Sequence, residues 1–230
     1  MIPKIIHYCW FGGNEKPKSV IKMINSWKKH CLDYEIKEWN ESNFDININQ
    51  YCKEAYQCGK WAFVSDVARL YALYTEGGIY LDTDVELIKP LDKFLYQKAF
   101  AGFEGTEWVG TNLIGAEKGN KVIQEFFSLY NDITFINYDS TLNTTTNVER
   151  LTALLEMNYK LKKNGNTQDL DSIKIFSTDY FCPYDYINGE LNCSSNTHSI
   201  HWYSQSWIKR NSIERKIKQF YHRIFGIKMK

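Results

Sequence analysis

The chain has 230 residues, a length that fits one domain or one domain with a small appendage. Its 28 lysine and arginine residues nearly balance 27 aspartate and glutamate residues, which argues against a whole-protein nucleic-acid binder. A hydrophobic share of 43% with 24% charged residues excludes a disordered chain, and the 16% of aromatic residues indicates stacking surfaces as well as a core.

The first forty residues predict the opening of an α/β fold. A β-rich run over 4–10 ends at the turn-forming residues 11–14. Pro17 opens a helix with apolar residues at helical spacing, and residues 34–39 then alternate as a strand. This β–loop–α–β order is typical of an α/β nucleotide-binding unit. Gly12-Gly13 is not a phosphate-binding fingerprint, because no further glycines follow at the required spacing.

A longer helix is predicted over residues 60–76, where apolar residues recur on one face. Gly77 and Gly78 end it, because glycine tolerates the left-handed conformation of a C-cap. The apolar strand 79–81 follows, and Asp82-Thr83-Asp84 comes directly after it. Short helices are expected within 40–58, further strands at 99–103, 111–115, 173–177 and 199–202, and further helices at 122–131 and 148–160.

Asp82 and Asp84 stand where the apolar strand ends. An Asp-x-Asp at such a place can present two carboxylates to one hard cation, because Mg²⁺ and Mn²⁺ prefer oxygen ligands. Ligands also bind at the carboxyl ends of strands in open α/β sheets. A solvated turn is the better interpretation of an isolated Asp-x-Asp. Here residues 85–88 are strand-like again, which embeds the pair in the sheet and favours a cation or donor beside it.

The helix before this strand carries Asp66 and Arg69, which share one face because they are three residues apart. A surface ion pair is the simplest interpretation. Both residues, however, lie within a mostly apolar segment, and charged residues in such surroundings are more often functional or paired in the interior.

Together these motifs resemble glycosyltransferase family 32, the sugar transferases with an Asp-x-Asp sugar-binding motif. The resemblance rests on residues 65–69 followed by 77–84, and on the opening residues 2–13. His201-Trp202 and Ser206-Trp207 are similar to the family's C-terminal motif, whereas residues 116–195 match loosely. The family includes Golgi initiating mannosyltransferases and bacterial capsule or O-antigen transferases, and the large glucosylating toxins share the same core pattern.

The resemblance implies a GT-A fold, in which a Rossmann-like central mixed sheet flanked by helices binds a nucleotide sugar. It also implies a divalent metal, Mn²⁺ or Mg²⁺, and transfer with retention at the anomeric carbon. The residues implied for catalysis are Asp66, Arg69 and Asp82, and those implied for the metal site are Asp84, Asp82 and His201. The residues implied for donor binding are Trp10, Phe11, Asp66, Arg69, Asp82, Thr83, Asp84 and Trp207.

Within this set the resemblance implies distinct roles. Trp10 would stack on the nucleobase, and Asp66 would accept hydrogen bonds from donor-sugar hydroxyls. Arg69 would contact the sugar or the diphosphate, and Trp207 would hold the diphosphate side. A metal that bridges the phosphates would stabilise the new negative charge of the leaving nucleoside diphosphate, together with Arg69 and an indole N–H.

Other positions have two interpretations each. His7 is expected to be a core histidine rather than a ligand. Asn112 is either a contact to donor or acceptor or a turn asparagine. Residues 144–147 predict a helix N-cap first and an acceptor-side loop second. Glu104 and Glu107, near Trp108, are either exposed loop acids, which is the simpler interpretation, or residues that line an acceptor cleft.

The net charge conceals an uneven distribution. Residues 209–230 hold eight basic residues and one acid, a charge of +7, whereas residues 1–208 hold 20 basic and 26 acidic residues, a charge of −6. Apolar residues in 209–230 recur at helical spacing, so a basic amphipathic helix is predicted. It either lies on an anionic membrane surface or packs on the 1–208 domain, and these two interpretations are compatible.

The sequence predicts a cytoplasmic protein. Its longest apolar runs are too short to span a membrane, and Lys4 interrupts the N-terminal apolar stretch, which favours a strand over a signal peptide. The six cysteines lack zinc-site spacing, and reduced thiols are expected, with a Cys52–Cys58 disulfide as the less favoured alternative.

We therefore predict a glycosyltransferase of bacterial surface polysaccharide synthesis that uses a nucleotide sugar, UDP-linked, and Mn²⁺ or Mg²⁺. Its expected acceptor is a glycan or a lipid-linked oligosaccharide, which would place it at the inner face of the membrane, and no nucleic-acid partner is expected. One alternative is a carbohydrate-binding module with a structural cation. Another is a sugar nucleotidyltransferase, but the glycine-rich loop with a lysine that such an enzyme needs is missing.

Overall fold

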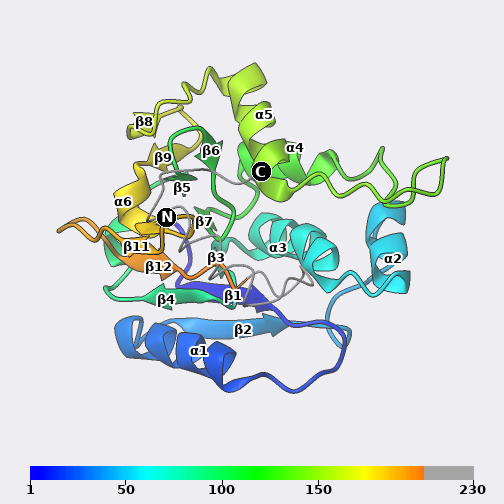
Figure 1. The fold of residues 1–230 in the computed structure, drawn as a ribbon, viewed down its shortest axis with the longest axis horizontal. Coiled ribbons are helices and arrows are strands. Elements are labelled where there is room, and N and C mark those ends of the chain that lie inside the picture. Colours follow the sequence, from blue (N-terminus) through cyan, green and yellow to red (C-terminus); the bar gives the residue numbers. More distant parts are fainter. Residues whose placement is uncertain (205–230) are drawn as a thin grey trace.

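A computed structural model describes residues 1–204, which form a mixed sheet covered by helices (Figure 1). The main sheet has eight strands in the order β2-β1-β3-β7-β5-β9-β8, and β6 pairs with β5. β1 is parallel to β2 and β3, β7 is antiparallel to both of its neighbours, and β9 is parallel to β5. The strand bounds are Ile5–Cys9 for β1, Glu35–Trp39 for β2, Gly78–Leu81 for β3, Ala99–Glu104 for β5, Trp108–Val109 for β6, Leu113–Ala116 for β7, Gln168–Asp169 for β8 and Lys174–Phe176 for β9.

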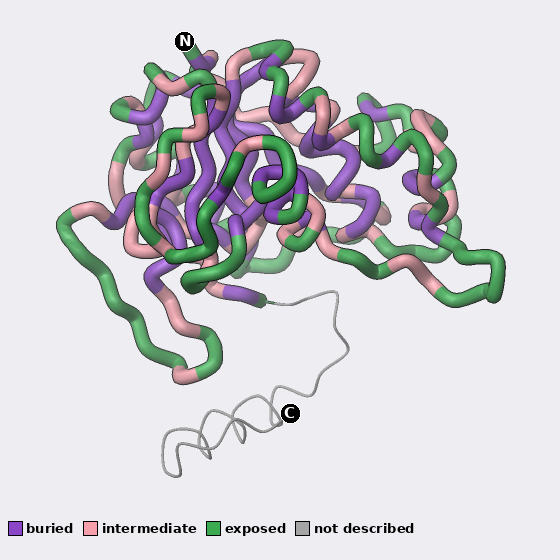
Figure 2. Tube along the Cα trace, turned by 90° about the horizontal axis from the view of Figure 1, so that it is seen from above, coloured by how far each residue is buried: buried purple, intermediate pink, exposed green. Residues whose placement is uncertain are grey.

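Two hydrophobic clusters lie against the main sheet. One includes apolar residues of α2, α3, α4 and α5, and the other includes apolar residues of α1. Because both faces are covered, β3 and β7 are buried along their whole length, and Figure 2 shows the central strands as a buried band. The helix bounds are Lys18–His30 for α1, Gln50–Gln57 for α2, Trp61–Glu76 for α3, Lys121–Ser128 for α4, Asn147–Tyr159 for α5 and Thr178–Phe181 for α6, with a 3₁₀ turn at Asp92–Phe94.

The junction between α3 and β3 depends on two glycines. Gly77 and Gly78 have φ angles of +70° and +110°, in the region that favours glycine. A Cβ on Gly77 would lie 2.6 Å from the backbone nitrogen of Lys118, and a Cβ on Gly78 would lie 2.7 Å from the carbonyl oxygen of Ile5. The pair therefore lets the helix end directly against the sheet, which fixes where β3 begins and where Asp82 follows it.

A second, two-stranded sheet joins distant parts of the chain. β4 (Val85–Leu87) pairs antiparallel with β12 (Ser199–His201), and His201 lies opposite Val85. A further hairpin joins β10 (Tyr184–Asp185) to β11 (Glu190–Leu191). The β4–β12 pairing brings the 199–204 segment beside Asp84.

The structure confirms the predicted fold class, a central mixed sheet flanked by helices. Residues 40–58 contain one helix, α2, which is preceded by turns. The helix starts after Asn49, because the Asn49 side chain accepts a hydrogen bond from the Cys52 nitrogen. All six cysteines are free, so the Cys52–Cys58 disulfide is not formed. Among residues 1–204, no helix is long and apolar enough to cross a membrane. The predicted helix over 209–230 lies outside the described residues and stays a prediction.

Candidate functional site

Strand direction brings the polar residues of the sequence motifs to one edge of the main sheet. β1 and β3 are parallel, so Trp10 and Asp82 follow strands that end at the same edge. β5 runs antiparallel to β7, which is itself antiparallel to β3, so Glu104 also ends its strand there. Asn112 directly precedes β7 and belongs to the same edge. The carboxyl ends of sheet strands thus meet here, as expected of a ligand site in an α/β fold.

Asp66, Arg69 and Asp82 form a cluster of charges in which Asp66 and Arg69 are buried and Asp82 is partly exposed. The Arg69 guanidinium lies 2.9 Å from a carboxylate oxygen of Asp66 and 3.2 Å from one of Asp82. It also donates to the carbonyl of Thr111 at 2.8 Å and packs 4.4 Å from the ring centroid of Tyr80. The Tyr80 hydroxyl donates to Asp82 at 2.9 Å. The predicted pairing in the interior is therefore confirmed, and a surface ion pair is excluded because Arg69 is only 5% exposed.

Burial and charge act against each other in this cluster. Burial and the Asp82 charge raise the pKa of Asp66 to about 6, because together they outweigh the opposing charge of Arg69. Burial alone would lower the pKa of Arg69, but Asp82, Tyr80 and Asp66 raise it above its ordinary value. The guanidinium thus stays charged and supplies a fixed cation beside the Asp-x-Asp.

Asp84 and His201 form the second half of the site. One Asp84 oxygen lies 3.3 Å from His201 Nε2, and the other accepts hydrogen bonds from the Ser204 backbone nitrogen and hydroxyl at 2.8 and 2.9 Å. Burial alone would raise the pKa of Asp84, but His201 and Ser204 lower it well below its ordinary value. Likewise burial opposes ionisation of His201, yet Asp84 raises its pKa well above the usual range.

Asp82, Asp84 and His201 together fit a divalent cation. One ligand atom from each of the three lies within 4.8 Å of the others. The set of two carboxylates and one imidazole suits Mg²⁺ or Mn²⁺. His201 Nδ1 is a buried atom without a hydrogen-bond partner, which marks the imidazole as incompletely satisfied.

The other residues implied for donor binding differ in their placement. Trp10 is partly exposed after β1, and its indole N–H donates to the Asn14 carbonyl at 2.6 Å, so the ring is held at the edge of the site. Thr83 is partly exposed between the two aspartates. Phe11 departs from the expectation, because it is only 5% exposed and packs edge-on against Phe44 in the core. Trp207 lies outside the described residues.

Several positions with two interpretations are now distinguished. His7 is fully buried, its Nε2 lies 2.7 Å from the Gly77 carbonyl and its Nδ1 accepts from Trp39, so it is the expected core histidine. Thr146 caps α5 in a reciprocal pair with Glu149, which confirms the N-cap.

Glu104 is not the exposed loop acid favoured from the sequence. It is partly buried at the end of β5, whereas Glu107 lies exposed on the turn after it. Burial raises the pKa of Glu104; the His201 charge opposes this shift and the Asp82 charge adds to it.

Tyr80, Asn112 and Asn147 also reach the site. The sequence analysis assigned a role there to Asn112 and to the 144–147 segment only as alternatives, and none to Tyr80. The Asn112 carbonyl accepts from the Asp82 nitrogen at 2.8 Å, and the Asn147 side chain donates to the Asp66 carbonyl at 3.2 Å. Tyr80 could have been found from the sequence, because residues two apart on a strand share a face and Tyr80 therefore lies beside Asp82.

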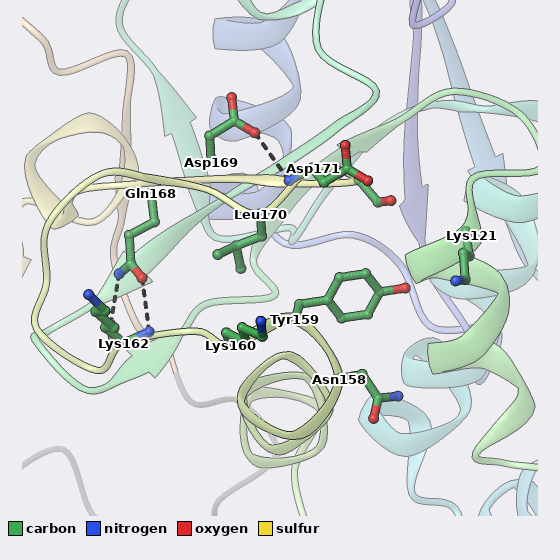
Figure 3. Close-up of a pocket in the computed structure, with 10 residues that line it drawn as sticks. Lys121, Asn158, Tyr159, Lys160, Lys162, Gln168, Asp169, Leu170 and Asp171 are labelled. Carbon is green, nitrogen blue, oxygen red and sulfur yellow. Dashed lines mark hydrogen bonds between the residues drawn. The ribbon is translucent and has the colours of Figure 1, made fainter.

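A large surface hollow of about 620 Å³ lies away from these residues (Figure 3). Its lining comes from α4, the end of α5 and the β8 region, including Lys121, Tyr159 and Asp171. Asp171 pairs with Lys98, just before β5, whereas Glu104 stands at the other end of that strand. The hollow therefore belongs to the opposite edge of the sheet and contains none of Asp66, Arg69, Asp82, Asp84 and His201.

Comparisons with known proteins identify this architecture. The structure resembles the PaToxG glycosyltransferase with a TM-score of 0.52 and 18% identity, over 69% of this chain and 70% of that one. The fold is thus the GT-A type predicted from the sequence. Residues 17–101 match the family described as "Glycosyltransferase sugar-binding region containing DXD motif".

Two relatives agree with this assignment. Inositol phosphoceramide mannosyltransferase 3 of Schizosaccharomyces pombe is 31% identical over 131 residues, which cover 52% of this chain and 34% of the relative. An uncharacterized glycosyltransferase of Acanthamoeba polyphaga mimivirus is 27% identical over 202 residues, 84% of this chain and 77% of the relative. The chain thus spans about a third of the length of the yeast mannosyltransferase. The matches confirm the predicted family resemblance and support a glycosyltransferase.

Proposed function

We propose that this protein transfers a sugar from a nucleotide-sugar donor, UDP-linked, to a glycan acceptor with the help of Mn²⁺ or Mg²⁺. The observation that carries the proposal is the meeting of two charge clusters at one edge of the sheet. Asp66 and Arg69 come from α3, Asp82 and Asp84 follow β3, and His201 ends β12.

The chain's own residues divide the work of donor binding. Asp82, Asp84 and His201 would hold the cation, which stabilises the negative charge of the leaving diphosphate. Arg69 adds a positive charge beside the Asp-x-Asp. Its guanidinium is fixed in position because it is buried and paired with Asp66 and Asp82. Asp66 would accept hydrogen bonds from hydroxyls of the donor sugar, and Trp10 would stack on the base. For Trp207 we propose a contact to the diphosphate.

Two finer properties follow the family resemblance. We propose transfer with retention at the anomeric carbon, which a proton NMR spectrum of the fresh product would test. We also propose an acceptor in bacterial capsule or O-antigen synthesis, carried as a lipid-linked oligosaccharide at the cytoplasmic face of the membrane. The support for that location is the predicted basic helix at 209–230.

Calorimetry with UDP-glucose and UDP, each with and without Mn²⁺, tests the donor side. We expect binding that needs the metal and that Asp84→Ala weakens at least about tenfold, since the change removes a proposed ligand. Asp139→Ala is the matched control, because Asp139 is exposed in a loop and bonds only to Thr141 nearby. Binding that ignores Mn²⁺ and survives Asp84→Ala would contradict the proposal and favour a carbohydrate-binding module.

A further inference from the structure

The β5–β6 hairpin presents a carboxylate and an indole side by side at the same sheet edge. Glu104 and Trp108 are directly opposite in the antiparallel pairing, so their side chains lie on one face of the hairpin. Trp108 is 42% exposed. Glu104 is partly buried beneath the same surface. An exposed indole beside a partly buried carboxylate offers an apolar surface and a hydrogen-bond acceptor to a ligand.

Contacts on both sides hold this hairpin in place. The backbone nitrogen of Val109 donates to the Thr152 hydroxyl of α5 at 2.9 Å. The Thr178 hydroxyl of α6 donates to the carbonyl of Gly105 in the turn. Lys163 stands 5.9 Å from the Trp108 ring centroid. The pair is therefore presented by a braced element, which lowers the entropy cost of binding.

The hairpin also connects directly to the proposed donor site. A Cβ on Gly110 would lie 2.6 Å from the Asn112 side-chain oxygen and 3.5 Å from Glu104 Oε2, so both side chains border the same small space. Asn112 is in turn bonded to the Asp82 nitrogen through its carbonyl. Its amide nitrogen Nδ2 is buried, with Asn112 only 3% exposed, and has no partner. An unsatisfied donor in this position indicates a missing polar ligand.

The strand order determines how far apart Glu104 and the proposed donor-binding residues lie along the edge of the sheet. In the order β1-β3-β7-β5, the residues met in turn are Trp10, Asp82, Asn112 and Glu104. Neighbouring strands lie roughly 5 Å apart, so Glu104 stands about 14 Å from Trp10 across the sheet. A nucleotide sugar laid with its base at Trp10 and its phosphates at Asp82 would bring its sugar end toward Glu104. The hairpin then borders the space from which an acceptor must approach.

We propose that Glu104 and Trp108 form the subsite for the acceptor sugar, an inference that rests on the proposed transferase function. The indole packs against the C–H face of the acceptor ring, and the Glu104 carboxylate accepts a hydrogen bond from the attacking hydroxyl. The hydroxyl oxygen forms its bond to the anomeric carbon as the bond from that carbon to the phosphate oxygen breaks. The hydroxyl proton leaves on the departing diphosphate, so Glu104 orients the acceptor and does not retain the proton.

Saturation-transfer NMR with methyl glycosides of mannose, glucose, galactose and N-acetylglucosamine, in the presence of UDP and the diamagnetic Mg²⁺, tests this subsite. We expect at least one glycoside to receive saturation from the protein. Glu104→Gln and Trp108→Ala should each weaken that binding about tenfold, the loss expected for one charge-assisted hydrogen bond or one stacking contact. Glu107→Gln, on the exposed turn of the same hairpin, and Tyr96→Ala, 80% exposed elsewhere, are matched controls and should bind as the wild type does.

A second readout separates the subsite from the donor site. With the glycoside that binds, nucleoside diphosphate release from a UDP-sugar should show a raised KM for the glycoside in Glu104→Gln, while calorimetric UDP affinity changes less than about twofold. Wild-type protein that binds UDP with Mn²⁺ but contacts no glycoside would overturn the subsite. So would equal glycoside affinity in wild type, Glu104→Gln and Trp108→Ala. Failure of UDP binding in the wild type would instead defeat the proposed transferase function.

Discussion

At the scale of single residues, Arg69 is the position on which the proposed donor site depends most. Its guanidinium contacts Asp66, Asp82 and the Thr111 carbonyl at once, from a side chain that is almost fully buried. A buried charge is costly unless an opposite charge or a hydrogen bond compensates it. Removing the Arg69 guanidinium therefore leaves the carboxylates of Asp66 and Asp82 uncompensated. Arg69 therefore serves both the stability of the fold and the charge of the site.

We expect Arg69→Ala to lower the free energy of unfolding by about 3–5 kcal/mol, because it leaves the buried Asp66 carboxylate and the partly exposed Asp82 carboxylate without their cation. Urea denaturation of purified protein measures this change. Lys121→Ala is the control, since Lys121 is an exposed partner of Glu125 at 3.7 Å and such pairs are worth less than about 1 kcal/mol. Equal destabilisation by the two substitutions would show that the cluster is not a buried charge network.

A second residue-scale prediction concerns acid. Burial, together with the charges of Lys93 and Lys89, lowers the pKa of His198 to about 4, although a hydrogen bond to the Pro90 carbonyl at 2.7 Å opposes this shift. The unfolded chain takes up the proton near pH 6.5 and the folded chain only near pH 4. Stability from this group is therefore complete above pH 6.5 and falls by about 1.4 kcal/mol per pH unit below it.

Urea unfolding at pH 7.5 and 5.5 checks this prediction. The wild type should lose stability between the two, and His198→Gln should lose about 1 kcal/mol less, because glutamine does not titrate in this range. An identical loss in both proteins would mean that His198 is not buried as a neutral ring.

At the scale of elements, the segment from α3 through Gly77-Gly78 to β3 could be predicted almost completely from the sequence. Its helical periodicity, glycine stop and apolar strand are local signals, and they place Asp66 and Asp82 correctly. Glu104 could not be placed in this way. Its environment depends on the two-residue strand β6, which is too short to leave a recognisable pattern, and on His201, which is distant in the sequence.

The glycine junction gives a test at this scale. We expect Gly78→Ala to destabilise the protein by more than about 2 kcal/mol, because its φ of +110° is strained for alanine and the new Cβ would meet the Ile5 carbonyl at 2.7 Å. Gly119→Ala is the matched control, since Gly119 has a φ of +72° but open space around it, and should cost about 1 kcal/mol. Thermal unfolding compares them; similar losses would indicate that the close approach of β1 is not what requires Gly78.

At the scale of the whole molecule, the near-neutral net charge is the sum of an acidic 1–208 segment and a basic 209–230 segment. The acids of the first segment include Asp66, Asp82 and Asp84, which the structure gathers around one place. The basic segment has the composition that favours anionic lipid surfaces.

We expect deletion of residues 209–230 to abolish binding to vesicles that contain phosphatidylglycerol, while Mn²⁺-dependent UDP binding survives. Each basic residue near an anionic surface contributes about 1 kcal/mol, and added salt should weaken the full-length interaction. Vesicles of phosphatidylcholine alone are the control. If the shortened protein and the full chain co-sediment with anionic vesicles to the same extent, residues 209–230 are not the membrane contact.

The pairing of β4 with β12 has a consequence for how the protein is made. A chain leaves the ribosome from its N-terminus, so Asp66, Arg69, Asp82 and Asp84 emerge long before His201. Until β12 is synthesised, β4 has no antiparallel partner and Asp84 lacks the imidazole beside it. The central sheet can therefore assemble first, and the proposed cation site is completed only after β12 has been synthesised, because His201 belongs to that strand.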